Sequence, residues 1–160
     1  MLTGKKVRFE DLFPIIEETL GKGKNFSFCA FGNSMLPFIR NGKDTVTLGP
    51  IDVPLAKNDV IFYRRKNGQF VLHRIVSTRP DGSFYLCGDN QFRIEKGIEK
   101  HQVIAKLIRL ERDGKELSLN ALPVRFWCFF LPFRRFFLHI LRSGQNRIKR
   151  IFKKHESIQP

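Results

Sequence analysis

The chain has 160 residues, of which 42% are hydrophobic and 28% are charged. These proportions are typical of a globular protein and exclude a wholly disordered, collagen-like or disulfide-dense chain, and the length leaves room for one ordinary domain with a short appendage. Lysine and arginine number 29 against 15 acidic residues, so the formal charge is +14 and we expect anionic partners.

The positive charge is concentrated at the C-terminal end of the chain. Residues 1–120 contain 20 basic and 14 acidic side chains, whereas residues 121–160 contain nine basic side chains and one acidic one, Glu156. This asymmetry, together with the patterns described below, predicts an N-terminal helical segment (1–24), a β-rich domain (25–120) and a basic, aromatic tail (121–160).

Cysteine spacing and hydropathy exclude several classes of protein. Cys29, Cys87 and Cys128 lie far apart without the short paired spacing of a zinc site, so we expect no disulfide, no metal and no cofactor. The N-terminus has no apolar stretch of signal-peptide length. The longest uncharged apolar run near the C-terminus, 126–133, has eight residues, whereas about 20 are needed to cross a bilayer. The sequence therefore predicts no transmembrane helix.

A short amphipathic helix is predicted at residues 9–20. Its apolar residues recur at steps of three and four, with Asp11 as the expected N-cap and Gly21 as the expected stop. With that start, Pro14 falls in the first turn, where proline is tolerated.

Residues 25–120 have the pattern of an antiparallel β-sheet. Short runs rich in Val, Ile, Phe, Tyr and Thr alternate with four Asn-Gly or Asp-Gly pairs, which favour tight hairpin turns. Three of those pairs join consecutive runs, so neighbouring strands are expected to be antiparallel. The expected strands are 25–31, 45–48, 59–64, 69–77, 83–87, 103–112 and 116–119.

The tail has the pattern of a basic amphipathic helix beyond Pro132. Arginine, lysine and His139 fall mostly on one side, and Phe, Ile and Leu mostly on the other. One interpretation is a helix packed on the sheet with its basic side in water. We favour a helix lying in a membrane interface over residues 124–154, because Phe and Trp opposite Arg and Lys suit that environment. Nucleic acid is the less favoured partner, because large Phe clusters are better explained by burial than by base recognition.

A turn-forming segment follows the first expected strand and contains a candidate nucleophile. Gly32, Asn33 and Ser34 lead into Met35 and Pro37, which places the Ser34 hydroxyl where the strand ends. A serine in such a turn is most often a turn hydroxyl or a helix cap. It becomes a nucleophile when a base lies within hydrogen-bond reach, because a free hydroxyl is a poor nucleophile near neutral pH.

His73 is the best candidate for that base. His139 and His155 lie in the basic tail and His101 in a charged loop, whereas His73 lies inside an apolar, strand-like run. An imidazole with its ordinary pKa of about 6.5 suits proton transfer and predicts an activity that rises across roughly pH 6–7.5. Asp89, in a Gly-Asp-Asn turn, offers a carboxylate that could orient the imidazole. Composition and spacing alone do not bring these residues together.

Four short motifs follow one another along the chain: Gly-Asn-Ser-Met-Leu-Pro (32–37), Asp-Val-Ile (59–61), Leu-His-Arg-Ile-Val (72–76) and Gly-Asp-Asn (88–90). In this order they resemble the signal peptidase I superfamily, which includes SOS-repressor-type self-cleaving proteases. The resemblance covers roughly residues 26–112. In that superfamily the base is commonly a lysine before an arginine. Here His73 precedes Arg74, which is similar to the branch found in endoplasmic-reticulum and sporulation-type signal peptidases.

The resemblance implies a serine endopeptidase on a mainly β, signal-peptidase-like fold. It assigns Ser34 as nucleophile, His73 as general base and Asp89 as orienting acid, with Glu95 as the alternative acid. Backbone N–H groups around Ser34 are the expected oxyanion donors, because Gly32 supplies no side-chain hydroxyl. The residues expected to form the turn, the oxyanion site and the substrate groove are Gly32, Asn33, Met35 and Pro37.

The resulting expectation is a peptidase without a membrane-spanning anchor. It would cleave a peptide or a membrane-associated protein in the cytoplasm, held peripherally on the inner face of the membrane by its tail. The alternative is a binding or scaffolding module that keeps the same fold without turnover, its basic tail binding membrane or nucleic acid.

Overall fold

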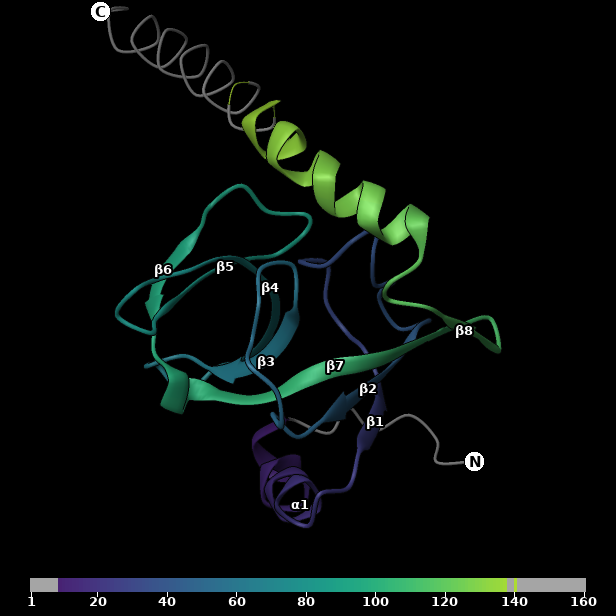
Figure 1. Ribbon diagram of the computed structural model, residues 1–160. Helices are drawn as coiled ribbons and strands as arrows, with labels where there is room; N and C mark the ends of the chain where they lie inside the picture. The colour runs from purple at the N-terminus through teal and green to yellow at the C-terminus, as the bar shows by residue number, and fades with distance from the viewer. Residues whose placement is uncertain (1–8, 138–139, 141–160) are drawn as a thin grey trace, which may run out of the picture.

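The computed structural model describes residues 9–137 and 140. Within these residues the chain is mainly β, with eight antiparallel strands between an N-terminal and a C-terminal helix (Figure 1). The elements are α1 (Phe9–Gly21), β1 (Phe26–Cys29), β2 (Thr45–Gly49), β3 (Val60–Arg64), β4 (Phe70–Thr78), β5 (Phe84–Cys87), β6 (Glu95–Ile98), the 3-10 turn η1 (Lys100–Gln102), β7 (Val103–Arg112), β8 (Lys115–Leu117) and a C-terminal helix that begins at residue 122.

Tight turns at the predicted positions connect three of the hairpins. The strands are ordered β1-β2-β7-β3-β4-β5-β6, with β8 on β7, and every pairing is antiparallel. Asn-Gly joins β3 to β4, and Asp-Gly joins β4 to β5 and β7 to β8. At the last turn both Asp113 (φ 51°) and Gly114 (φ 73°) have the positive φ that a type I′ turn requires. The local turn chemistry therefore accounts for this part of the topology.

Each of the seven expected strands overlaps an observed one, and one strand was not expected. The unexpected strand, β6, begins at Glu95 and continues through Lys96 and Gly97. Charged residues and glycine are depleted in strands, so its composition gives no β signal. It forms because β5 offers an edge, on which Phe84 pairs with Ile98 and Leu86 with Glu95.

The N-terminal helix α1 is present where the apolar spacing predicted it. Asp11 lies inside the helix rather than at its N-cap, because the helical backbone already includes Phe9. The apolar face packs on the sheet, where Ile16 and Leu20 are buried against Leu48 and neighbouring side chains of β3 and β7. Figure 1 shows α1 at the opposite end of the molecule from the C-terminal helix.

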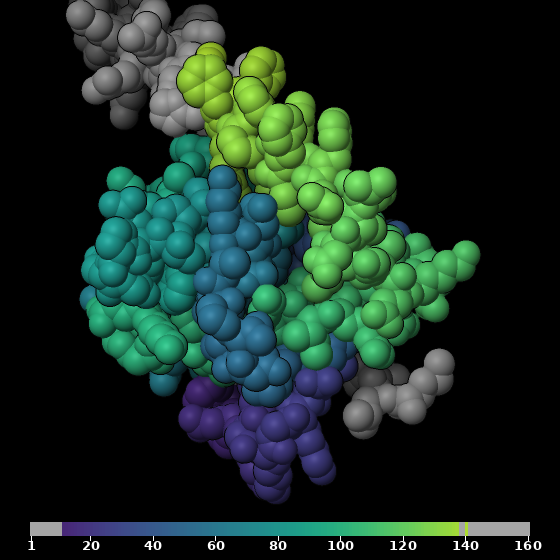
Figure 2. Space-filling view, in the orientation of Figure 1, coloured from purple at the N-terminus to yellow at the C-terminus, as the bar shows by residue number. Residues whose placement is uncertain are grey.

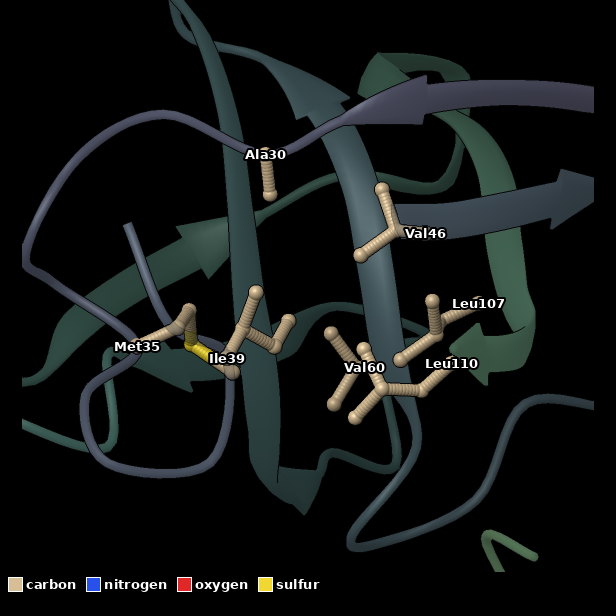
Figure 3. Packing of buried hydrophobic residues seen from close by; sticks show 7 residues of the cluster. All are labelled: Ala30, Met35, Ile39, Val46, Val60, Leu107 and Leu110. Carbon is tan, nitrogen blue, oxygen red and sulfur yellow. The ribbon is translucent and has the colours of Figure 1, made fainter. Parts of the chain in front are cut away.

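A hydrophobic cluster anchors the loop that connects β1 to β2. Met35 and Ile39 come from this loop and are 5% and 3% exposed. They pack with Val46, Val60 and Leu110 and with the other labelled side chains in Figure 3. Because interiors are close-packed, these two anchors fix the position of the loop that carries Ser34.

The C-terminal helix packs on the domain through the face that also carries Arg134 and Arg135. Trp127 and Arg134 contact the turn after β5, and Leu131 is 1% exposed. Phenylalanine side chains cover the opposite face (Figure 2). Arg135, which the packed interpretation of the sequence placed on a basic side facing water, is largely buried. The predicted tail positions 138–139 and 141–160 lie outside the described residues. In the described part of the chain, no helix combines the length and hydropathy needed to cross a membrane.

Candidate active site

The loop between β1 and β2 holds Ser34 by hydrogen bonds as well as by its buried anchors. The backbone N–H of Gly32 donates to Oδ1 of Asn41 over 2.9 Å. Gly32 has a φ of 115°, which lies in the region that favours glycine. This position therefore bends the chain just before the turn at Asn33, Ser34 and Met35, which we call the nucleophile turn because it carries the candidate nucleophile. Pro37 is exposed and Met35 is buried, so Met35 acts mainly as an anchor.

A buried carboxylate holds the far end of the same loop. Asp44 is fully buried and accepts hydrogen bonds from Nε of Arg40 (2.8 Å) and Nη2 of Arg112 (2.7 Å). Arg112 also donates to the carbonyl oxygen of Phe38 over 2.9 Å. Burial alone would raise the pKa of Asp44, but the bonds from Arg112 and Arg40 lower it overall. The carboxylate therefore stays ionised and ties the loop to β7.

Ser34 and His73 meet at Gly88. A Cβ atom on Gly88 would lie 2.5 Å from the carbonyl oxygen of Ser34 and 3.1 Å from Nε2 of His73. Such contacts are too short for a side chain, so the close approach of the nucleophile turn, β4 and the turn after β5 requires glycine at this position. Asn90 completes the junction, donating from its backbone N–H to Ser34 O (2.8 Å) and from Nδ2 to Asn33 O (3.1 Å).

The other ring nitrogen of His73 faces a carboxylate. Nδ1 lies 3.1 Å from Oε1 of Glu95 and 3.3 Å from the hydroxyl of Tyr63, and the imidazole is 1% exposed. Glu95 is held in turn by Nε of Arg65 (2.8 Å), by a second bond from Nη2 of Arg65 and by Tyr63. An ionised carboxylate only accepts hydrogen bonds, so Nδ1 carries the proton and Nε2 is left as the acceptor on the Ser34 side.

Burial determines the protonation state of this pair. It lowers the pKa of His73 from 6.5 to about 4, against the opposite effect of Glu95. For Glu95, burial raises the pKa, but the hydrogen bonds from Arg65 and Tyr63 outweigh it and the pKa is lowered overall. The neutral imidazole beside an ionised carboxylate is therefore the form present near neutral pH. This pKa replaces the ordinary value from which the pH range 6–7.5 was predicted.

Asp89, the first candidate for the orienting acid, is bound elsewhere. Its carboxylate is fully buried and accepts from Nε and Nη2 of Arg74 (2.8 and 2.7 Å) and from Nε1 of Trp127 (3.1 Å). Successive side chains of a strand point to opposite faces, so His73 and Arg74 are directed to opposite sides of β4. Asp89 lies with Arg74, and the alternative acid, Glu95, lies with His73.

Ser34 and His73 are not hydrogen-bonded to each other in this structure. Within the described residues, the Ser34 hydroxyl and Nε2 of His73 have no hydrogen-bond partner, and the backbone N–H groups of Ser34 and Met35 donate none. Catalytic hydrogen bonds in unliganded sites are often longer than in the substrate complex. The free N–H groups are suitable donors for an oxyanion next to the hydroxyl.

Two hollows meet at Ser34 and give it access from solvent. One has a volume of about 300 Å³ and is lined by Ser34 and His73 together with apolar side chains that include Phe31, Met35 and Leu72. The other, of about 950 Å³, is more polar and runs from Ser34 past Glu95. Ser34 therefore lies where an apolar hollow and a more polar one adjoin.

Comparison of this chain with protein-family models, curated proteins and solved structures gives no match.

Arg134 of the C-terminal helix reaches the junction at Gly88. Its Nη2 donates to Oδ1 of Asn90 over 2.8 Å, and its Nη1 donates to the carbonyl oxygen of Asp89. Asn90 in turn binds the backbone of Ser34. The helix is thus linked to the nucleophile turn through one residue.

The sequence pointed to some of these residues and missed others. Ser34, His73 and Glu95 come together, and Gly32 and Asn33 lie in the same loop. The roles of Gly88 and Arg134 were missed, because a close backbone approach and a contact across the fold leave no local signal. The sequence did contain one signal for Arg74. Side chains alternate along a strand, so Arg74 and any group that binds it are expected on the opposite face from His73.

Proposed function

We propose that this chain is a serine endopeptidase of signal-peptidase-like type, in which Ser34 is the nucleophile, His73 the general base and Glu95 the orienting acid. The observation that carries the proposal is the convergence of Ser34 and Nε2 of His73 on Gly88, with an ionised carboxylate on the far nitrogen of the same imidazole. The antiparallel sheet and the order of the four motifs support the same fold assignment.

The proposed reaction is acyl transfer through a covalent intermediate. Nε2 of His73 takes the proton of the Ser34 hydroxyl as the oxygen attacks the peptide carbonyl, and Glu95 stabilises the imidazolium that forms. The N–H groups of Ser34 and Met35 bind the oxyanion. The imidazolium then protonates the leaving amine, and the same base activates the water that hydrolyses the acyl-enzyme.

Labelling with a fluorophosphonate tests the nucleophile without knowledge of the substrate. We expect modification of Ser34 in the native chain, and none in Ser34→Ala or in urea-unfolded protein. His73→Ala should slow the labelling by at least about 100-fold, a typical contribution of a general base. Circular dichroism and thermal unfolding of both variants serve as the folding control.

Failure of Ser34 to react under any condition, in protein that is folded, contradicts the proposal. The 300 Å³ hollow would then be assigned to peptide binding without turnover. If labelling succeeds, mapping the peptides that the wild type releases and Ser34→Ala does not would identify the substrate and the cleavage site.

A further inference from the structure

The outer side of the C-terminal helix is a continuous apolar surface, which we call the aromatic face. Its side chains are between 48% and 69% exposed. Single exposed apolar residues are ordinary on protein surfaces, but a contiguous patch of large ones marks an interaction site. The aromatic face consists of Phe126, Phe129, Phe130, Phe133, Phe136, Phe137 and Ile140.

The opposite side of the helix is fastened, so the aromatic face cannot turn inward. Leu131 is buried, Trp127 donates to the carboxylate of Asp89, and Arg134 donates to Asp89 and Asn90. Rotating the helix to bury its phenylalanines would break these bonds and leave the buried carboxylate of Asp89 less well paired, which is costly. Figure 2 shows side chains of the C-terminal helix standing out beside the β domain.

The composition of the aromatic face favours lipid as its occupant. Its side chains contain no hydrogen-bonding atom, which matches hydrocarbon and the apolar part of a headgroup layer. A single-stranded nucleic acid needs cations among the aromatic rings. Of the arginines on this helix, Arg134 binds the turn after β5 and Arg135 is largely buried near Asp89. In the described part of the helix this leaves Arg125 as the exposed arginine, a single cation beside seven large apolar side chains.

The positive charge of the chain also favours an anionic membrane as the partner. The segment that follows the aromatic face, residues 141–160, contains six basic residues and one acidic residue, and the whole chain carries +14. Two copies with this charge repel each other, which opposes a dimer through the same face. An anionic leaflet attracts it, with about 1 kcal/mol for each basic residue near the surface.

We propose that the aromatic face lies in the interface of an anionic membrane, with the helix axis parallel to the surface. The phenylalanine rings enter the boundary between headgroups and acyl chains, and the net positive charge of the chain attracts it to the anionic leaflet. The inference does not depend on catalysis, because no side chain of the aromatic face lines the hollows at Ser34.

Co-sedimentation of the full chain with vesicles tests this proposal. One set of vesicles is phosphatidylcholine alone and the other is phosphatidylcholine with phosphatidylglycerol. The double variant Phe126→Gln/Phe136→Gln removes two side chains that are each 69% exposed, and glutamine keeps the helix propensity. The matched control is Ile15→Gln/Val53→Gln, which removes two side chains, 55% and 51% exposed, outside the C-terminal helix.

We expect the wild type to bind the anionic vesicles, to bind phosphatidylcholine at least about tenfold more weakly, and to be released by high salt, which screens the attraction. The Phe variant should bind anionic vesicles at least about tenfold more weakly, and the control should bind like the wild type. Equal binding by the Phe variant, or an equal loss in the control, would overturn the proposal.

Two further outcomes would also overturn it. One is a dimer of the wild type in sedimentation equilibrium without vesicles that the Phe variant abolishes, since the face would then join two copies. The other is binding of a single-stranded oligonucleotide that excludes vesicles and is lost in the Phe variant.

Discussion

At the scale of single residues, the site depends on which carboxylate faces which side chain of β4. Glu95 faces the imidazole of His73, and Asp89 faces the guanidinium of Arg74. Both carboxylates are hydrogen-bonded by an arginine fork, but only the first is within 3.1 Å of the proposed base. Replacing each acid by its amide should therefore have two different effects.

We predict that Glu95→Gln impairs the reaction and that Asp89→Asn impairs the fold. Glu95→Gln no longer stabilises an imidazolium, so the rate of fluorophosphonate labelling should fall by about 100-fold or more. Asp89→Asn leaves the buried Arg74 without its counter-ion and should lower the free energy of unfolding by about 3–5 kcal/mol. Labelling kinetics and urea unfolding of both variants check this. If Asp89→Asn has native stability but is labelled slowly, and Glu95→Gln is labelled at the wild-type rate, then Asp89 is the orienting acid and the prediction is wrong.

At the scale of elements, the C-terminal helix is linked by hydrogen bonds to the loop that carries Ser34. Arg134 contacts Asn90, and Asn90 holds the carbonyl oxygen of Ser34 at 2.8 Å. An error of about 1 Å in the position of a reacting group is enough to slow a reaction markedly. In the proposed reaction Arg134 is therefore a positioning residue, which acts on Ser34 through Asn90.

We predict that Arg134→Gln slows the labelling of Ser34 by about tenfold while the pH at which labelling is half-maximal stays the same, since His73 keeps its surroundings. Arg134→Lys should recover little, because lysine lacks the planar fork that reaches both Asp89 and Asn90. The matched control is Arg125→Gln, an exposed arginine on the same helix. A slowdown shared by the control, or a shift of the pH midpoint, would contradict the positioning role.

At the scale of the whole molecule, burial of a histidine makes stability depend on pH. The pKa of His73 is about 4 in the folded chain and about 6.5 when unfolded, because burial disfavours the imidazolium. The unfolded chain therefore binds more protons between these values, so the contribution of His73 is intact above pH 6.5 and is lost as pH falls toward 4.

We predict that acidification from pH 7 to pH 4 costs the wild type up to about 3 kcal/mol of unfolding free energy more than it costs His73→Gln. In His73→Gln the hydrogen bonds from Arg65 and Tyr63 still lower the pKa of Glu95, so the difference comes mainly from the imidazole. Urea unfolding at several pH values measures it. Parallel curves for the two proteins would show that His73 titrates alike in both states. In the native chain, labelling of Ser34 should correspondingly reach half its maximum near pH 4.

The sequence by itself determined the features that depend on neighbouring residues. Asn-Gly and Asp-Gly pairs specified the hairpins, apolar spacing specified α1, and the order of short motifs indicated Ser34 and His73. These features are local, since a turn or a strand face is set by residues a few positions apart.

Only the tertiary structure decided what depends on contacts between distant segments. The strand β6 exists because β5 offers it an edge, and it brings Glu95 to His73. The burial that lowers the pKa of His73, the close approach at Gly88 and the inward direction of Arg134 arise from the same packing. Neither composition nor spacing contains these distances, because a chain specifies them only when its elements pack against one another.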